Sequence, residues 1–226
     1  MALVLFPGAK GPLCAILPGM TKRTAEWTAY HEAGHAVAAY ALRLSLPKWV
    51  TIVPKDHAAG MCQNDGVFSQ RPEVLRAMLA TRRPGMTRAA ARAALRASTE
   101  RHVVAELAGL AAEGRRRHFS RLLAGYVLFR DVAAVADDDV AQADEQLAVF
   151  ERGREAREAW LSGLWDRAWK LTGASWRDVE RVAKALLRRK RLDGDALDRL
   201  LLPPVDPKEL RRVQRAIKAS KRRARP

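Results

Sequence analysis

The sequence predicts a mainly α-helical protein with one small β-hairpin. Long stretches between residues 24 and 202 lack proline and begin with residues that cap helices. One short run, residues 49–53, has the β-branched and aromatic composition of a strand, and residues 60–63 are a candidate partner. The chain has 226 residues, of which 48% are hydrophobic, so it is long enough for one good-sized core. We therefore expect one principal domain with extensions.

The first expected helix runs from about residue 24 to residue 42. Thr24 is a suitable N-cap, and no proline follows until Pro47. Gly34 lies in the middle of this helix, where it costs about 1 kcal/mol relative to alanine. Another group must therefore approach the backbone closely at this point. A substrate strand and a tightly packed helix are the two candidates.

The strand at 49–53 and its partner at 60–63 are expected to form the hairpin beside this first helix. Nearly all of the remaining chain is expected to be helical. The expected helices cover residues 73–80, 87–113, 139–171, 175–191, 195–201 and 208 onward. Helix starts are indicated by Ser175 with Asp178, and by Asp206-Pro207 with Glu209.

The two ends of the chain are expected to lie outside the domain at 24–202. Residues 1–23 contain several proline and glycine breakers and are expected to be a flexible arm. Met20 directly precedes the first expected helix and is an alternative start to Met1. Residues 203–226 are expected to form a basic helix or tail. Its part at 208–226 holds nine lysines and arginines against one acid, which is net +8 of the chain's +16. This tail could bind nucleic acid or an acidic partner, or could simply be solvated.

The cysteines and the hydrophobic pattern indicate a cytoplasmic protein. Cys14 and Cys62 are too few for a disulfide scaffold, which fits a reducing compartment. No apolar run approaches about 18 residues, so we expect no membrane-spanning helix. The apolar opening at residues 1–6 lacks a basic leader and reads poorly as a signal peptide.

The first helix carries the motif H-E-x-x-H at His31, Glu32 and His35. Four residues of helix turn about 400°, so the two imidazoles lie on one face, close enough to share a metal. Zinc held by two histidines and a carboxylate keeps a position open for water, whose pKa falls toward about 7, and a neighbouring glutamate can take its proton. The motif therefore indicates a zinc metallopeptidase with Glu32 as the base. The alternative is a chance pattern on an alanine-rich helix, and the helical context favours the metal site.

Several segments carry a resemblance to one family. Residues 29–36 (Ala-Tyr-His-Glu-Ala-Gly-His-Ala) resemble the zinc helix of the FtsH-type peptidases, the M41 metallopeptidase domain. The other similar segments are residues 50–55 with 59–60, residues 104–113 and residues 186–197. Within 104–113, Leu110 stands where this family has an arginine. The resemblance covers about residues 24–202 and implies a helical, zincin-like peptidase domain.

The same resemblance implies the third zinc ligand. In the family it is an aspartate in an N-D-L-x-x-A segment, and residues 138–143 match this segment, which makes Asp139 the expected ligand. These acids could instead complement the dipole of a helix N-terminus, which contributes only about 0.3 to 1 kcal/mol. The alternative ligands are Asp137, Asp138, Asp131 and Glu113.

The other histidines and the tryptophans are expected to be structural. None of the remaining histidines has ligand spacing to another, although the one in the hairpin region could line the cleft. They are His57, His102 and His118. Tryptophans in a helical setting are expected to anchor the core rather than to stack on bases. These are Trp160, Trp165, Trp169 and Trp176.

The resemblance implies a Zn²⁺-dependent metalloendopeptidase that cleaves unfolded or flexible protein segments. The sequence contains no G-x-x-x-x-G-K-S/T motif, so we expect a free-standing, ATP-independent peptidase that borrows a separate unfoldase or acts on exposed segments. An oligomer would match the family's ring. Residues 64–101 are longer than their family counterpart and hold eight arginines against two glutamates, which suggests a basic, partner-facing insertion. The alternative is a non-proteolytic adaptor with basic binding surfaces, against which the intact Glu32 argues.

Overall fold

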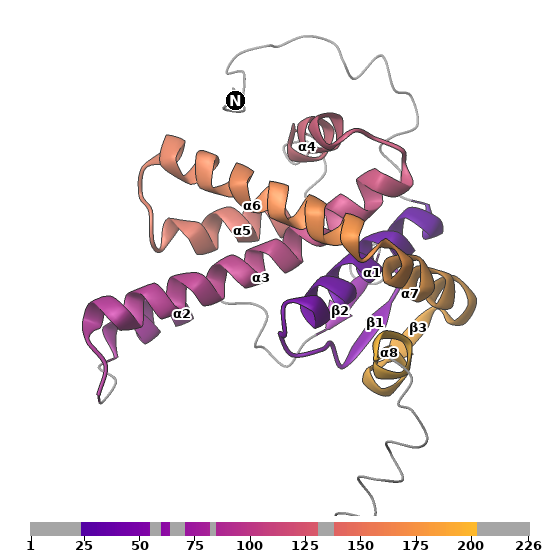
Figure 1. Ribbon diagram of the computed structural model, residues 1–226, viewed down its shortest axis with the longest axis horizontal. Helices are drawn as coiled ribbons and strands as arrows, with labels where there is room; N and C mark the ends of the chain where they lie inside the picture. The colour runs from indigo at the N-terminus through magenta and orange to yellow at the C-terminus, as the bar shows by residue number, and fades with distance from the viewer. Residues whose placement is uncertain (1–23, 55–59, 64–70, 82–84, 131–137, 203–226) are drawn as a thin grey trace, which may run out of the picture.

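The computed structural model describes residues 24–54, 60–63, 71–81, 85–130 and 138–202, and this part of the chain is mainly α-helical (Figure 1). It contains eight helices and a small antiparallel sheet of three strands. The helices are α1 (Ala25–Ala41), α2 (Pro72–Ala80), α3 (Arg88–Arg116), α4 (Arg121–Arg130), α5 (Asp138–Ala148), α6 (Arg154–Ala174), α7 (Trp176–Arg189) and α8 (Gly194–Leu201). The strands are β1 (Trp49–Thr51), β2 (Met61–Gln63) and β3 (Arg191–Asp193). The mainly α class predicted from the sequence is confirmed.

Helix α1 begins where its sequence predicts. The Thr24 hydroxyl accepts a hydrogen bond from the backbone N–H of Trp27 at 3.3 Å, so it caps the first turn. The helix is buried along most of its length because it packs against both α3 and α7. A Cβ atom at Gly34 would lie 2.3 Å from the carbonyl oxygen of Ala108. Tight packing against α3, rather than a substrate strand, therefore accounts for this glycine.

The predicted hairpin is present, and a third strand extends it. β1 lies between β2 and β3 and pairs antiparallel with both, so that Val50 faces Cys62 on one side and Leu192 on the other. The prediction of helices at 175–191 and 195–201 included no strand between them and so missed β3. Lys190 ends α7 with a left-handed φ of 65°, which turns the chain back toward β1. Three residues with one buried leucine carry too little alternation to signal a strand.

The long helix predicted at 139–171 is wrong, because α5 and α6 are separate helices that fold back on each other (Figure 1). Gly153 is the N-cap of α6, and its N–H donates to a Glu151 carboxylate oxygen at 2.8 Å. This local bond stabilises the turn between the two helices. Helix α4 was not predicted, whereas the other predicted helices within the described residues are present with shifted ends.

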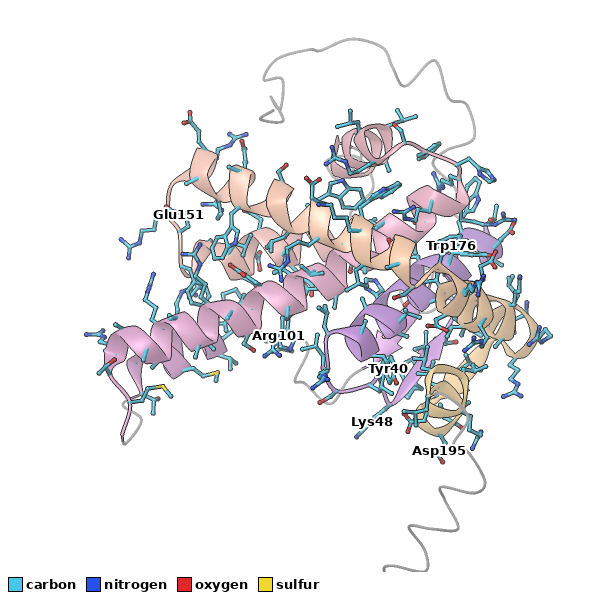
Figure 2. The ribbon with its side chains drawn as sticks, viewed as in Figure 1. Tyr40, Lys48, Arg101, Glu151, Trp176 and Asp195 are labelled. Atoms are coloured by element: carbon cyan, nitrogen blue, oxygen red, sulfur yellow. The ribbon has the colours of Figure 1, made fainter. Side chains whose placement is uncertain are left out.

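The hydrophobic core of the described residues consists of two large clusters and a small alanine cluster between α1 and α3. One large cluster joins α1, the sheet, α7 and α8, and here the ring of Tyr30 stacks on Trp176 with centroids 5.5 Å apart. Figure 2 labels Trp176, which begins α7. The other large cluster joins α3, α4, α5 and α6 around the buried Trp165. All four tryptophans named from the sequence pack in or against these clusters, which confirms their structural role. Because α1 packs along α3, the two clusters meet at these helices.

The outer parts of the predicted domain plan fall partly outside the described residues. Residues 1–23 and 203–226, including the helix predicted from 208 onward, belong to this undescribed part. Of the basic segment at 64–101, the described residues form α2 and the N-terminal half of α3, which project together away from the sheet (Figure 1). Among the described helices, none combines the length and the apolar composition needed to cross a bilayer.

Candidate metal centre

Three side chains from two helices converge beside α3. His31 and His35 lie one turn apart on α1, and their Nε2 atoms are 3.0 Å from each other. Asp139 lies in the first turn of α5, and its Oδ2 atom is 3.0 Å from Nε2 of His31 and 3.3 Å from Nε2 of His35. The three atoms therefore form a nearly equilateral triangle, built from residues more than a hundred positions apart in the chain.

This triangle is close in size to one face of a tetrahedral zinc site, with edges of 3.0, 3.0 and 3.3 Å. Ligand atoms about 2.0 to 2.1 Å from a tetrahedral zinc are separated from one another by about 3.3 to 3.4 Å. The Oδ2 atom of Asp139 is buried and has no hydrogen-bond partner among the described residues, although two imidazole nitrogens lie close to it. A buried oxygen that approaches two nitrogens without hydrogen-bond geometry is what a shared cation would explain. The donor set of two imidazoles and one carboxylate suits zinc.

The outer nitrogen of each imidazole has its own partner. Nδ1 of His35 is 2.9 Å from the carbonyl oxygen of Ala105 and donates to it. In the neutral ring the lone pair is then on Nε2. Nδ1 of His31 is 3.4 Å from Oε2 of Glu113. A carbonyl and a carboxylate behind the two rings orient both Nε2 atoms toward Asp139, as in carboxylate–histidine–metal arrangements.

Glu113 is held in turn by Arg117. The Glu113 side chain is 1% exposed, and its Oε1 atom is 2.6 Å from Nη2 of Arg117 one turn further along α3. The guanidinium lies 3.9 Å from the ring centroid of Trp27, which precedes His31 by one turn on α1. The two helices thus run antiparallel here, so that Trp27 faces Arg117 and His31 faces Glu113. The sequence indicated Glu113 only as an alternative ligand. Its spacing of four from Arg117 is the signal that could have indicated an ion pair along one face of the helix.

Because Gly109 has no side chain, the two imidazoles can lie directly against α3. A Cβ atom at this position of α3 would lie 2.4 Å from Nε2 of His35 and 3.0 Å from Nε2 of His31. Any larger residue would therefore intrude between α3 and the Nε2 atoms that face Asp139. The sequence pattern contained this glycine in the family-like segment but assigned no role to it.

Glu32 lies on the side of α1 that faces the hairpin. Its side chain is buried, and a Cβ atom at Gly60, just before β2, would lie 2.6 Å from its Oε1 atom. Burial, together with the charges of Glu32 and Asp139, raises the pKa of the Cys62 thiol on β2. The edge of the sheet formed by β2 therefore lies beside the same group of residues.

The electrostatics of the triangle favour charge separation in the metal-free protein. Burial opposes ionisation of Asp139, but the two histidines outweigh it and hold the pKa of the carboxyl well below its usual range. Burial also disfavours the imidazolium of His35, yet the Asp139 carboxylate raises the pKa of this histidine overall. Two imidazoles beside an ionised carboxylate can bind a cation when the histidines are neutral, because their Nε2 lone pairs are then available.

The other sequence candidates that the structure describes lie outside the triangle. Asp131, Asp137 and His57 lie outside the described residues. Glu113 is on the Nδ1 side of His31, away from the triangle. His102 is buried and its Nδ1 atom bonds the carbonyl of Ser98 at 2.8 Å, while His118 is exposed after the end of α3, as expected for structural or solvated histidines.

No protein-family model matches this chain, and no curated protein matches it either. The geometry of the site therefore carries the functional argument, and the resemblance in the sequence motifs adds to it.

Proposed function

We propose that this protein is a zinc-dependent metalloendopeptidase of the FtsH (M41) type that hydrolyses peptide bonds in unfolded or flexible segments. The observation that supports it most is the convergence of His31, His35 and Asp139 on one point, beside a buried glutamate in the H-E-x-x-H motif. When bound there, zinc would polarise a peptide carbonyl and lower the pKa of water.

Residues of the chain would carry out proton transfer and bind the peptide. Glu32 would accept the proton of the attacking water and deliver it to the leaving amine. The backbone of β2, an edge strand in the described part of the sheet, offers unpaired N–H and C=O groups to an extended peptide. Gly60 lets the backbone before that strand pack closely against Glu32, since a Cβ atom there would lie 2.6 Å from its Oε1 atom. Such a site accepts an extended chain, which is why we propose flexible segments as substrates.

The test is zinc content measured together with peptide cleavage. The wild type should bind about one zinc per chain, and His31→Ala or His35→Ala should lose it, because two remaining protein ligands hold the metal poorly. Glu32→Gln is the matched variant. It should keep the zinc and the fold but lose nearly all hydrolysis, since an amide cannot accept the proton.

Two outcomes would count against this function. A well-folded wild type without zinc, after growth with the metal supplied, would remove the proposed cofactor. Zinc binding without cleavage of any unstructured chain would instead favour the adaptor, which would bind nucleic acid or protein through basic surfaces. A Glu32→Gln variant that cleaves at the wild-type rate would show that another group is the base.

A further inference from the structure

Glu106 of α3 and Gln146 of α5 meet between their helices, near the metal centre but outside it. Nε2 of Gln146 donates to Oε1 of Glu106 at 2.7 Å, and the Gln146 side chain is 2% exposed. Each side chain keeps one buried oxygen without a hydrogen-bond partner in the described residues, Oε2 of Glu106 and Oε1 of Gln146. Two unsatisfied buried acceptors in a single pair are costly, so their coincidence requires an explanation.

A single proton on Glu106 would satisfy both oxygens. If Glu106 is a neutral carboxylic acid, its O–H donates to the amide oxygen of Gln146 while the amide N–H donates back. Burial raises the pKa of Glu106, the hydrogen bond from Gln146 opposes this, and the charge of Asp139 raises it further, to about 8. The direction of this shift agrees with the geometry, because a group with such a pKa keeps its proton at neutral pH.

The pair lies on the faces of α3 and α5 that carry the metal centre. Gln146 follows Asp139 by seven residues, which is nearly two turns, so both side chains share one face of α5. Glu106 precedes Gly109 by three residues on α3, which is also one face. Asp139 is in the first turn of α5, and the segment before it, 131–137, is outside the described residues. Among the described contacts, those further along α5 are therefore the ones that can fix the position of Asp139.

We propose that Glu106 and Gln146 form a neutral acid–amide pair that docks α5 on α3 and thereby positions Asp139 in the metal centre. Both are positioning residues, and the second half of this inference rests on the proposed zinc function.

Several charged groups on the described elements around the pair have partners of their own or are exposed. From α5, Asp139 acts on Glu106; from α1, His35 bonds the carbonyl of Ala105, next to Glu106. On α6, Arg157 pairs with Asp144 and Arg167 pairs with Glu100. The charged residues of α2, Glu73 and Arg76, are exposed.

The pair itself is tested by the pH dependence of unfolding in zinc-free protein, with Glu106→Gln as the matched variant. A carboxyl whose pKa is raised in the folded state keeps a proton that the unfolded chain releases above its ordinary value of 4.5. The stability that this proton provides is therefore present at low pH and is lost as the pH rises toward about 8. Relative to Glu106→Gln, the folding equilibrium constant of the wild type should fall by up to about tenfold per pH unit across this range.

The positioning role is tested by zinc affinity in a chelator competition. Gln146→Leu leaves the acid without its partner and should weaken zinc binding about tenfold, whereas Glu106→Gln should stay close to the wild type because an amide pair can make the same two hydrogen bonds. If Gln146→Leu fails to fold, Gln146→Glu combined with Glu106→Gln restores an acid–amide pair and should recover zinc binding.

Each outcome has a definite meaning. Parallel pH profiles for the wild type and Glu106→Gln would show that Glu106 is ionised, with a bound water in place of the proton, and would overturn the pair. Unchanged zinc affinity in folded Gln146→Leu would overturn the positioning role. If the wild type itself binds no zinc, the proposed function and the positioning role fail together, while the pH profile still decides whether the pair exists.

Discussion

At the scale of single residues, the proposed metal centre depends on which nitrogen of each histidine faces the triangle. The carbonyl of Ala105 and the carboxylate of Glu113 engage the Nδ1 atoms. Both Nε2 atoms are consequently left to face Asp139. Two of the proposed ligands come from one helical turn, whereas the third depends on a helix that begins only one residue before it.

We predict that Asp139→Asn weakens zinc binding by far more than Asp138→Asn. Successive side chains at a helix start point about 100° apart, so neighbouring carboxylates cannot both face one metal. An asparagine keeps the shape of the side chain but supplies a neutral, weaker donor. Zinc affinity by competition with a chromogenic chelator is the measurement. Equal affinities in the two variants would move the third ligand elsewhere.

We also predict that Glu113→Gln lowers zinc affinity by about 10- to 100-fold, because the carboxylate behind His31 raises the basicity of that ligand and holds its ring. Glu26→Gln is the matched control. Glu26 also pairs with an arginine of α3, Arg116, but its side chain is 44% exposed and it does not contact a histidine in any described interaction. A control variant that loses as much zinc affinity as Glu113→Gln would indicate a general loss of helix packing instead.

At the scale of elements, the close crossing of α1 and α3 builds the site. Gly34 lets the Ala108 carbonyl approach α1, and Gly109 lets the two histidines lie against α3. Both glycines are within helices, where the missing Cβ costs stability in isolation. That cost is offset by the packing of α1 against α3 and by the position that this crossing gives to the imidazoles.

We predict that Gly109→Ala abolishes tight zinc binding and destabilises the fold by about 1 to 3 kcal/mol, since the new methyl group would displace the imidazole of His35. Gly163→Ala is the control, because a Cβ atom at that position of α6 has no neighbour within 4 Å. This second change should stabilise the protein by up to about 1 kcal/mol and leave zinc binding unchanged. Thermal unfolding and zinc titration of both variants check the prediction, which a zinc-binding Gly109→Ala protein would contradict.

At the scale of the whole molecule, α1 joins the two hydrophobic clusters. One side of α1 packs against the sheet, α7 and α8. Its other side packs against α3, which in turn contacts α5 and α6. The three residues of the triangle therefore come from both halves of the fold. Zinc bound to them would crosslink α1 and α5, so zinc should raise the thermal stability of the protein as a whole.

We predict that the protein digests unstructured, casein-like chains equally well with and without ATP, and that it spares a compact stable domain. Opening such a domain costs about 5 to 15 kcal/mol, which hydrolysis at a zinc site does not supply. The 226 residues contain no G-x-x-x-x-G-K-S/T motif with which to use ATP for unfolding. Cleavage followed by gel electrophoresis, with a destabilised variant of the same domain as the control, checks this. ATP-stimulated digestion of the stable domain would contradict it.

Local patterns were sufficient for much of this molecule. Thr24 and the proline-free run after it predicted α1, and the H-E-x-x-H spacing placed two imidazoles on one face of that helix, because helix geometry fixes the relation of residues four apart. Asp139 was reached through the resemblance of its segment, and the structure brings it to the histidines. The strand β3 and the break between α5 and α6 were missed, since short elements and turns carry weak periodicity.

The sequence by itself thus determined the helical class, the pair of histidines and the glutamate beside them, all of which follow from residues within one or two helical turns. Only the tertiary structure decided which glycine makes room for the imidazoles, that Glu113 stands behind His31, and that Glu106 meets Gln146. These relations join residues 40 or more positions apart, as in the Glu106–Gln146 bond, and distance along a chain does not encode which helix faces come together. Side-chain packing between helices determines that, and it depends on all of the contacting residues at once.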